Sequence, residues 1–394
     1  MIALVWNSPI ALGDISIRYE LYAQGLLAMG EDSLTICLKG CEPGYPYPVR
    51  TVDGEGVLHD SAFWQDTGCR AVVVITWHRM TGILRAIQNA GLPTVAIGDS
   101  DARCSPRFHP WPTLRFMTYL QPTWKGKLAA AKHWLQRYLF QAAVEHRALI
   151  ENTAASDVLT LADRGAVDEF RRVLVSLGSP ELAERVGWLP YPVPESFCCG
   201  DVNSERPRRV IAIGRWDSTQ KNPGLLAATI QRLSWAGDRT EIIIVGRGAE
   251  ERFAGVARRR SQVQVLGIQP RERIRELMGS CRAVLVPSRW EGAPIVANEM
   301  LTLGGTVVGT PIPSLQSLTA DGQFGRVSRT HSSGALAKEI MAEMDTWDVG
   351  KRVPREISDH WRGLVSPTVV ARRVVEFIDS RDLPSRVAGP ELSL

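Results

Sequence analysis

Two cationic side chains follow an expected strand in the second half of this 394-residue chain, at a spacing that suits a doubly charged anion. Arg215 and Lys221 lie in one loop that begins at Gly214, and Pro223 opens the helix after it. A fixed guanidinium and a fixed ammonium can offset the charge of a pyrophosphate leaving group. The loop predicts a diphosphate site, with ordinary solvated charges at a helix start as the alternative.

Two acids follow another expected strand further along the chain. Glu291 lies in the loop that continues through Gly292, Ala293, Pro294 and Ile295, and Glu299 is expected in the first turn of the next helix. That loop can aim backbone N–H groups at the same anion, and the helix adds its positive N-terminal end. Glu299 suits the vicinal hydroxyls of a ribose, and Glu291 suits a sugar. Glu291 is also compatible with a plain capping role.

A third strand-end loop reads Gly246-Arg247-Gly248. Arg247 is counted with the anion-binding groups, although a surface charge explains it equally well. The loop lacks the third glycine of a dinucleotide fingerprint, which excludes a nicotinamide site.

Strands alternate with helices in both halves, which predicts parallel sheets joined by right-handed crossovers. Expected strands are 2–6, 33–38, 71–77, 94–97, 209–213, 241–245, 263–266, 283–286 and 306–309. Expected helices are 17–29, 81–90, 223–235, 270–279, 296–303 and 367–379. Ligands bind beyond the carboxyl ends of such strands, where the charged loops lie.

The segment 263–310 resembles the C-terminal domain of glycosyltransferase family 4. The resemblance rests on Val265-Leu266-Gly267, on Pro287-Ser288 followed by Glu291-Gly292, on the E-x7-E spacing that ends at Glu299, and on Arg215 and Lys221 as G-R-x5-K. It implies a GT-B fold, in which two Rossmann-like α/β domains face a central cleft. It also implies retaining transfer of a sugar from a nucleoside diphosphate sugar to an acceptor hydroxyl. By this resemblance Arg215 and Lys221 bind the donor diphosphate, Glu299 the ribose and Glu291 the transferred sugar, without metal or cofactor.

Three segments follow from this resemblance. We expect an acceptor-side domain over 1–200, a donor-binding domain over 201–366, and a C-terminal helix and tail over 367–394. The Pro-rich, polar segment 191–208 is expected to link the domains.

The first half departs from the family pattern. Gly13 lies where the family has a glycine pair, but Asp14 would repel a diphosphate there. His78 and Asp99 follow expected strands, and Asp99 or Asp101 would bind the acceptor hydroxyl or only close a turn. Asp99-Ser100-Asp101 also spells a metal-binding D-x-D, which we reject because the donor residues lie in the other half.

No acidic residue occurs between Asp101 and Glu145, where basic and aromatic residues alternate. The stretch 103–140 is either a solvated helix with a packed face or a docking surface for anionic lipid. No nucleic-acid-binding module surrounds it.

Composition fits a soluble globular protein, with a formal net charge of +4 and seven scattered cysteines that suggest free thiols rather than a disulfide framework. Without an expected signal peptide or membrane span, the chain is expected in the cytoplasm, or on a membrane surface. Glycan or glycolipid assembly is the default role. The alternatives are a catalytically silent nucleotide-sugar-binding protein and a sugar-nucleotide epimerase.

Overall fold

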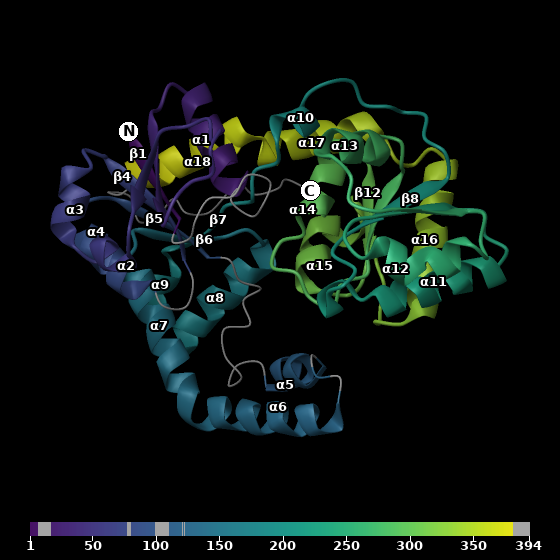
Figure 1. The fold of residues 1–394 in the computed structure, drawn as a ribbon, viewed down its shortest axis with the longest axis horizontal. Coiled ribbons are helices and arrows are strands. Elements are labelled where there is room, and N and C mark those ends of the chain that lie inside the picture. The colour runs from purple at the N-terminus through teal and green to yellow at the C-terminus, as the bar shows by residue number, and fades with distance from the viewer. Residues whose placement is uncertain (7–16, 77–79, 99–109, 120, 122, 381–394) are drawn as a thin grey trace. The chain divides into compact units, whose positions relative to one another are not determined.

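The computed structural model describes residues 1–6, 17–76, 80–98, 110–119, 121 and 123–380 (Figure 1). The chain divides into two compact units. The first contains Met1–Pro192 together with Pro367–Leu394, and the second contains Val193–Ser366. The boundary expected at 200/201 therefore falls inside the second unit, and the C-terminal helix belongs to the first.

The first unit is built on a seven-stranded parallel sheet of order β3-β2-β1-β4-β5-β6-β7. Its strands are β1 (Ile2–Trp6), β2 (Ser33–Leu38), β3 (Val49–Val52), β4 (Ala71–Thr76), β5 (Thr94–Gly98), β6 (Val158–Leu161) and β7 (Val186–Trp188). Its helices are α1 (Ile17–Ala28), α2 (Glu55–Leu58), α3 (Ser61–Asp66), α4 (Thr81–Asn89), α5 (Pro110–Tyr119), α6 (Trp124–Gln136), the π-helical turn η1 (Arg137–Gln141), α7 (Ala142–Ala154), α8 (Arg164–Ser176), α9 (Pro180–Ala183) and α18 (Pro367–Asp379). The central strands are continuous apolar runs, as expected for strands buried on both faces.

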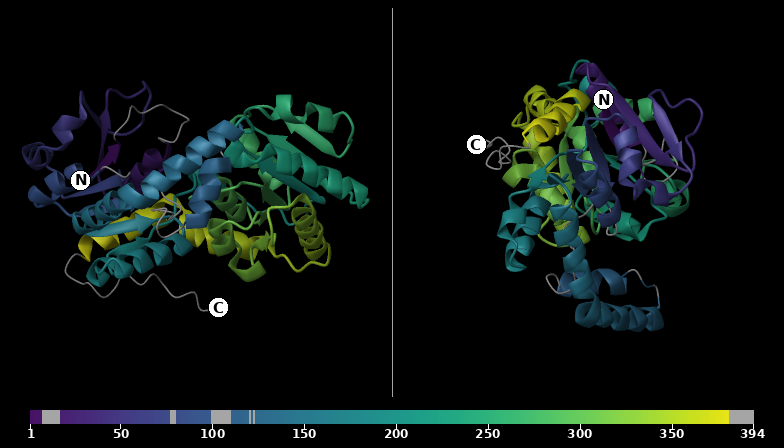
Figure 2. Two further views of the ribbon diagram at one scale, coloured as in Figure 1. Left: turned by 90° about the horizontal axis from the view of Figure 1, so that it is seen from below. Right: turned by 90° about the vertical axis from the view of Figure 1, so that its left-hand side faces the viewer.

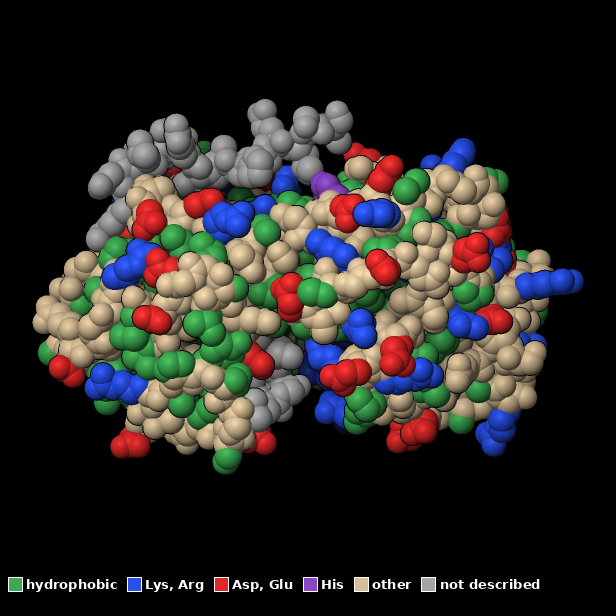
Figure 3. All heavy atoms as spheres, turned by 90° about the horizontal axis from the view of Figure 1, so that it is seen from above, with side chains coloured by type: hydrophobic (Ala, Val, Ile, Leu, Met, Phe, Trp, Pro, Cys, Tyr) green, Lys and Arg blue, Asp and Glu red, His purple; other side chains and the backbone are tan. Residues whose placement is uncertain are grey.

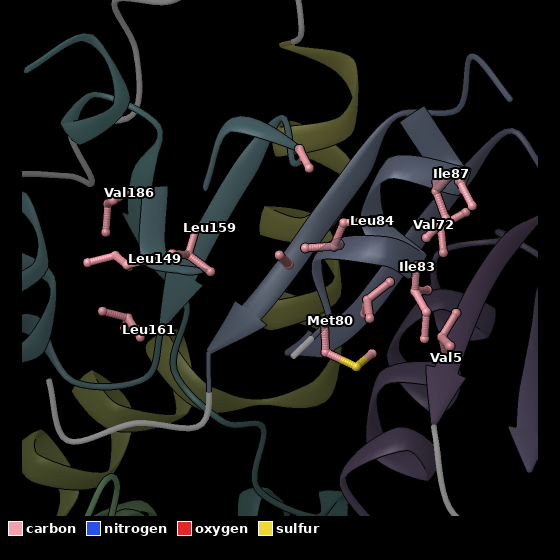
Figure 4. Packing of buried hydrophobic residues seen from close by; sticks show 14 of the residues in the cluster. Val5, Val72, Met80, Ile83, Leu84, Ile87, Leu149, Leu159, Leu161 and Val186 are labelled. Carbon is pink, nitrogen blue, oxygen red and sulfur yellow. The ribbon is translucent and has the colours of Figure 1, made fainter. Parts of the chain in front are cut away.

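The core of this unit lies between the sheet and its helices. Ile83 and Ile87 of α4 are fully buried and belong to one apolar cluster with Val5 and Val72 of the sheet (Figure 4). On α1, the chain reverses at Gly30, whose φ of +79° confirms the expected glycine helix end.

The last helix, α18, packs along α1 within the same unit. The contact is close at Gly25, where an added Cβ would lie 2.2 Å from the carbonyl oxygen of Pro367. Only a residue without a side chain lets the two helices approach this far.

The second unit is built on a six-stranded parallel sheet of order β10-β9-β8-β11-β12-β13. Its strands are β8 (Arg209–Ile213), β9 (Glu241–Val245), β10 (Val263–Leu266), β11 (Ala283–Val286), β12 (Thr306–Gly309) and β13 (Gly325–Val327). Its helices are α10 (Glu195–Cys198), the 3-10 turn η2 (Thr219–Lys221), α11 (Pro223–Trp235), α12 (Ala249–Ala257), α13 (Arg271–Gly279), α14 (Ile295–Thr302), α15 (Pro313–Thr319), the 3-10 turn η3 (Ala320–Gly322), α16 (Ser333–Asp348) and α17 (Pro354–Val365).

The boundary between the two units, at Pro192/Val193, lies inside the segment 191–208 that was expected to link them, but several residues of this segment pack into the second unit. Val193 and Phe197 are fully buried in the core of the second unit. Arg206 is buried as well, and its guanidinium donates to the carbonyl oxygen of Cys281 at 2.8 Å. Apolar side chains among the prolines explain why this segment packs.

Candidate donor site

The order of strands in the second sheet brings two of the charged loops together. β8 pairs with both β9 and β11, so the sheet runs through β9 and β10 on one side and through β11 to β13 on the other. The segments after β8 and β11 therefore leave neighbouring strands at the same edge. Such a switch point is where open parallel sheets bind ligands.

A buried tryptophan anchors the loop after β8. Trp216 is fully buried, its Nε1 donates to the carbonyl oxygen of Val245 at 2.9 Å, and its ring meets Phe253 edge-on. Gly246 has a φ of +119°, and a Cβ there would lie 2.1 Å from the carbonyl oxygen of Gly214. At this point the backbones of the loops after β8 and β9 are in direct contact.

Lys221 and Glu291 form an ion pair between the two loops. Lys221 Nζ lies 2.5 Å from Glu291 Oε1, and the two side chains are 16% and 9% exposed. Ser288 Oγ donates to the same oxygen at 2.6 Å, while Gln220 Nε2 donates to Glu291 Oε2 at 3.1 Å. The carboxylate of Glu291 thus fixes the ammonium of Lys221, a contact that spacing in the sequence did not predict.

Further hydrogen bonds join the same two loops. The Arg289 backbone N–H donates to Gln220 O at 2.9 Å, and its guanidinium donates to Thr219 O at 3.1 Å and to Asn222 Oδ1 at 2.6 Å. Asn222 adopts a left-handed conformation with a φ of 55° just before α11. Gln220 and Arg289 were missed by the sequence reasoning, since their partners are about 70 residues away in the chain. Ser288 was identified only as part of a motif, without its hydrogen bond to Glu291 three residues later.

Hydrogen-bond donors remain unused beside this cluster. In the part of the chain that the structure describes, the exposed Arg215 side chain has no hydrogen bond or ion pair. Within the same ranges, no acceptor receives the backbone N–H of Gly292, Ala293 or Ile295. Ile295 opens α14, whose N-terminal end favours negative charge.

Arg247 lies at the surface. Its Nε is 2.7 Å from Asp217 Oδ2, and the two side chains are 59% and 46% exposed. An exposed pair of this kind contributes little to stability. Both interpretations left open by the sequence, an anion-binding group and a surface charge, are compatible with this exposed position.

Glu299 lies just past the first turn of α14, one residue further into the helix than expected. The first turn of α14 contains no acidic residue, because the helix begins at Ile295 and Glu299 is its fifth residue. The Glu299 side chain is only 4% exposed, and its Oε1 lies 2.5 Å from Arg271 Nη2. Burial raises the pKa of Glu299, and the nearby Arg271 guanidinium opposes that rise.

Arg271 is a further residue that the sequence did not reveal. It opens α13, and its guanidinium carbon lies 5.4 Å from the ring centre of Phe197. Its Nε is buried without an acceptor. The pair of Arg271 and Glu299 joins α13 to α14, and long-range pairing of this kind leaves no local sequence signal.

The residues expected on the acceptor side cannot be placed in the same way. Gly13, His78, Asp99 and Asp101 all lie outside the described residues. They follow β1, β4 and β5, which are neighbours in the first sheet. β1 and β4 flank the point where the strand order of that sheet reverses.

Within the described ranges, no group of three or more His, Cys, Asp or Glu side chains could hold a metal ion. The cysteines described, Cys37, Cys41, Cys69, Cys198, Cys199 and Cys281, are free thiols. No described helix is both long and apolar enough to cross a bilayer.

The basic, aromatic stretch forms a helical hairpin in the first unit. α5 and α6 pack side by side (Figure 2). Trp134 Nε1 donates to Thr113 Oγ1 at 3.0 Å. Trp124, Leu128 and Leu135 recur at helical spacing on α6 and are 67%, 60% and 48% exposed. We call these three residues the α6 stripe.

Basic residues accompany the α6 stripe. Lys125, Lys127 and Lys132 are exposed on the same helix, and no acidic residue occurs from 102 to 144. On the face of the molecule shown in Figure 3, by contrast, acidic and basic side chains are interspersed. The hairpin therefore combines exposed apolar area with one sign of charge.

Comparison with known proteins places this geometry in a wider context. Residues 207–345 match the family model described as glycosyl transferases group 1. The chain is 26% identical over 215 residues to the alpha-D-kanosaminyltransferase of Streptomyces kanamyceticus, which covers 50% of this chain and 54% of that protein. The chain thus spans about half the length of this curated relative.

Solved structures resemble the whole chain. HepE of Anabaena in complex with UDP gives a TM-score of 0.68 at 14% identity, covering 96% of this chain and 99% of that one. WaaG, a glycosyltransferase of lipopolysaccharide biosynthesis, gives 0.58 at 16% identity, with coverage of 96% and 99%. At identities this low, the similarity shows the fold alone. It confirms the expected α/β class and the GT-B fold.

Proposed function

We propose that this chain is a retaining glycosyltransferase that moves a hexose-type sugar from a nucleoside diphosphate sugar to an acceptor hydroxyl, without a metal. The observation that carries the proposal is the Lys221 ammonium held by Glu291 at the switch point of the second sheet, beside Arg215. The match of residues 207–345 to glycosyl transferases group 1 and the UDP bound to HepE support it.

Each group has a role in this proposal. Arg215 and Lys221 stabilise the negative charge that develops on the departing diphosphate, and a preorganised cation is most effective there. The unused N–H groups of Gly292, Ala293 and Ile295 add hydrogen bonds to the same phosphates. Glu299 binds the ribose, and Arg271 fixes the orientation of its carboxylate.

The first role of Glu291 in this scheme is to position Lys221. Its carboxylate accepts hydrogen bonds from the side chains of Lys221, Ser288 and Gln220. It therefore orients the cation that meets the leaving group, and it approaches the transferred sugar from the same loop. Retention at the anomeric carbon, cytoplasmic location and a role in glycan or glycolipid assembly belong to the proposal through resemblance.

A ligand-binding experiment tests the donor. Thermal unfolding of the purified chain is measured with UDP-, GDP- and ADP-sugars, and one of the three classes is expected to raise the transition temperature. Arg215→Ala and Lys221→Met should abolish that rise. Arg252→Ala, which removes an exposed arginine from α12, should leave it unchanged. If no nucleotide stabilises the wild type, the donor proposal fails.

Product analysis then distinguishes the alternatives. Transfer, or slow hydrolysis of the stabilising donor to free sugar, supports a transferase. An epimerised sugar without a transfer product would instead indicate an epimerase. Stabilisation with no turnover under any condition would indicate a binding protein.

We also propose that the α6 stripe docks on an anionic membrane surface, which would bring the chain to a lipid-linked acceptor. The supporting observation is the exposed Trp124, Leu128 and Leu135 beside three lysines. Liposome flotation tests it: anionic vesicles should bind the wild type, and Trp124→Ser with Leu128→Ser should not bind. Leu27→Ser, at another exposed leucine, is the matched control. Equal flotation of all variants, or no preference for anionic lipid, would contradict the proposal.

A further inference from the structure

Two arginines lie against one tryptophan in the first unit. The guanidinium carbon of Arg164 is 4.1 Å from the ring centre of Trp188, and that of Arg373 is 4.7 Å from it. The indole is fixed, because its Nε1 donates to the carbonyl oxygen of Ala162 at 3.1 Å. Three elements distant in the sequence, α8, β7 and α18, thus build one cluster.

The positive charge of this cluster is only partly balanced within the described chain. Asp168 and Glu376 act on Arg164 and Arg373 from a distance, but neither carboxylate forms an ion pair with these guanidinium groups, and Arg373 Nη1 is buried without an acceptor. Burial lowers the pKa of both guanidinium groups, the charge of Arg164 lowers that of Arg373 further, and the two carboxylates oppose these shifts. Removing unpaired cations from water is costly, so such groups normally have an anionic partner.

The place of the cluster in the fold also favours an anion. Arg164 is the first residue of α8, a 13-residue helix, and a helix start attracts negative charge and disfavours a cation. α8 follows β6, and Trp188 is the last residue of β7. The cluster therefore lies at the carboxyl ends of the first sheet, the edge at which parallel sheets bind ligands.

From this juxtaposition we propose that Arg164 and Arg373, held by Trp188, bind a phosphate group. Guanidinium groups present forked N–H donors that match phosphate oxygens, and a dianion would compensate both charges at once. The site takes a phosphate-bearing small molecule or headgroup. That this phosphate belongs to the acceptor rests on the function proposed above, whereas the binding itself does not.

The test places a reporter inside the cluster. The full chain is labelled with 5-fluorotryptophan, and the fluorine signal of Trp188 is assigned by its loss in Trp188→Phe. Inorganic phosphate is then titrated against chloride at equal ionic strength. The signal should shift saturably with phosphate and not with chloride, and this readout is insensitive to phosphate bound at other sites.

Matched variants make the result specific. Arg164→Gln and Arg373→Gln should each weaken the phosphate response by about tenfold or more, because each removes a charge-assisted pair. Arg172→Gln and Arg372→Gln remove exposed arginines from the same two helices and should leave the response unchanged. The proposal would be overturned if phosphate did not shift the fluorine signal of Trp188 in the wild type, or if all four variants showed the same shift with phosphate.

A second arm identifies the source of the phosphate. Dihexanoyl phosphatidic acid, kept below its micelle concentration, is titrated in the same way, and tighter binding than inorganic phosphate assigns the site to a lipid headgroup. Equal or weaker binding assigns it to a soluble phosphate. Stabilisation by the nucleotide donor should be normal in Arg164→Gln and Arg373→Gln, so this proposal and the donor proposal fail separately.

Discussion

Replacing Glu291 with glutamine should destabilise the second unit, because it leaves the Lys221 ammonium without its counter-charge. Breaking a fully buried ion pair costs about 3–5 kcal/mol. Lys221 and Glu291 remain 16% and 9% exposed, so solvent screens part of this interaction. We therefore expect a loss of about 2 kcal/mol, below the fully buried range. For a unit of this size that corresponds to a transition about 4–8 °C lower.

The assay is differential scanning calorimetry of a double-mutant cycle. Lys221→Met should cost less than Glu291→Gln, because Ser288 and Gln220 still donate to the carboxylate. The double variant should be more stable than the sum of the single losses predicts, with a coupling of about 2 kcal/mol. If Glu291→Gln melts within about 1 °C of the wild type, or if the two losses simply add, the pair does not stabilise the loops.

Three further outcomes follow from the geometry. Arg215→Ala should lower the rate of sugar transfer about a hundredfold or more while the melting temperature stays unchanged, since its exposed side chain has no partner in the described ranges; normal turnover would refute its role. Burial raises the pKa of Glu299 above 4.5 against the opposing effect of Arg271, so the stability that this carboxyl contributes is present below pH 4.5 and lost as pH rises through the raised pKa. Calorimetry from about pH 4 to about pH 8 should therefore show that the stability of Glu299→Gln increases relative to that of the wild type as pH rises. A stability difference that does not change with pH would contradict the raised pKa. Gly25→Ala should cost about 1–3 kcal/mol by forcing α18 away from α1, whereas Gly56→Ala adds a Cβ with no atom within 4 Å; equal melting of the two variants would show that the helices tolerate the change.

Five of the six strands of the second unit were predictable to the residue. The expected ranges 209–213, 241–245, 263–266, 283–286 and 306–309 are those of β8 to β12. Most of these strands are short apolar runs bounded by glycine, proline or charge, and burial between helices leaves little ambiguity about their ends. Periodicity was not needed, because a strand buried on both faces need not alternate.

Two short edge strands, β3 and β13, were not predicted. Three of the four residues of β3 are fully or partly exposed, and β13 contains only Gly325, Arg326 and Val327. Their backbone pairs with a neighbouring strand that the local sequence does not specify. The same limit explains the one-residue displacement of Glu299, since the start of α14 depends on how the loop after β11 is held.

Spacing and resemblance identify candidate residues for the site but not the contacts between them. They single out Arg215, Lys221, Glu291 and Glu299, whose roles in donor binding stay predictions. Their partners were not identified, because Lys221 meets Glu291, and Arg271 meets Glu299, only after the sheet is assembled. Spacing identifies side chains near one strand end, whereas pairing between strand ends is a property of the topology.

The second unit is in effect an insertion within the first, because α18 returns to α1 after residue 366. During translation, Val193–Ser366 can leave the ribosome as one continuous segment and fold while the end of the chain is still being made. The first unit cannot be completed, and the face of α1 stays uncovered, until the helix that begins at Pro367 has been synthesised. A premature stop before α18 would consequently damage the N-terminal half of the protein rather than the half in which it occurs.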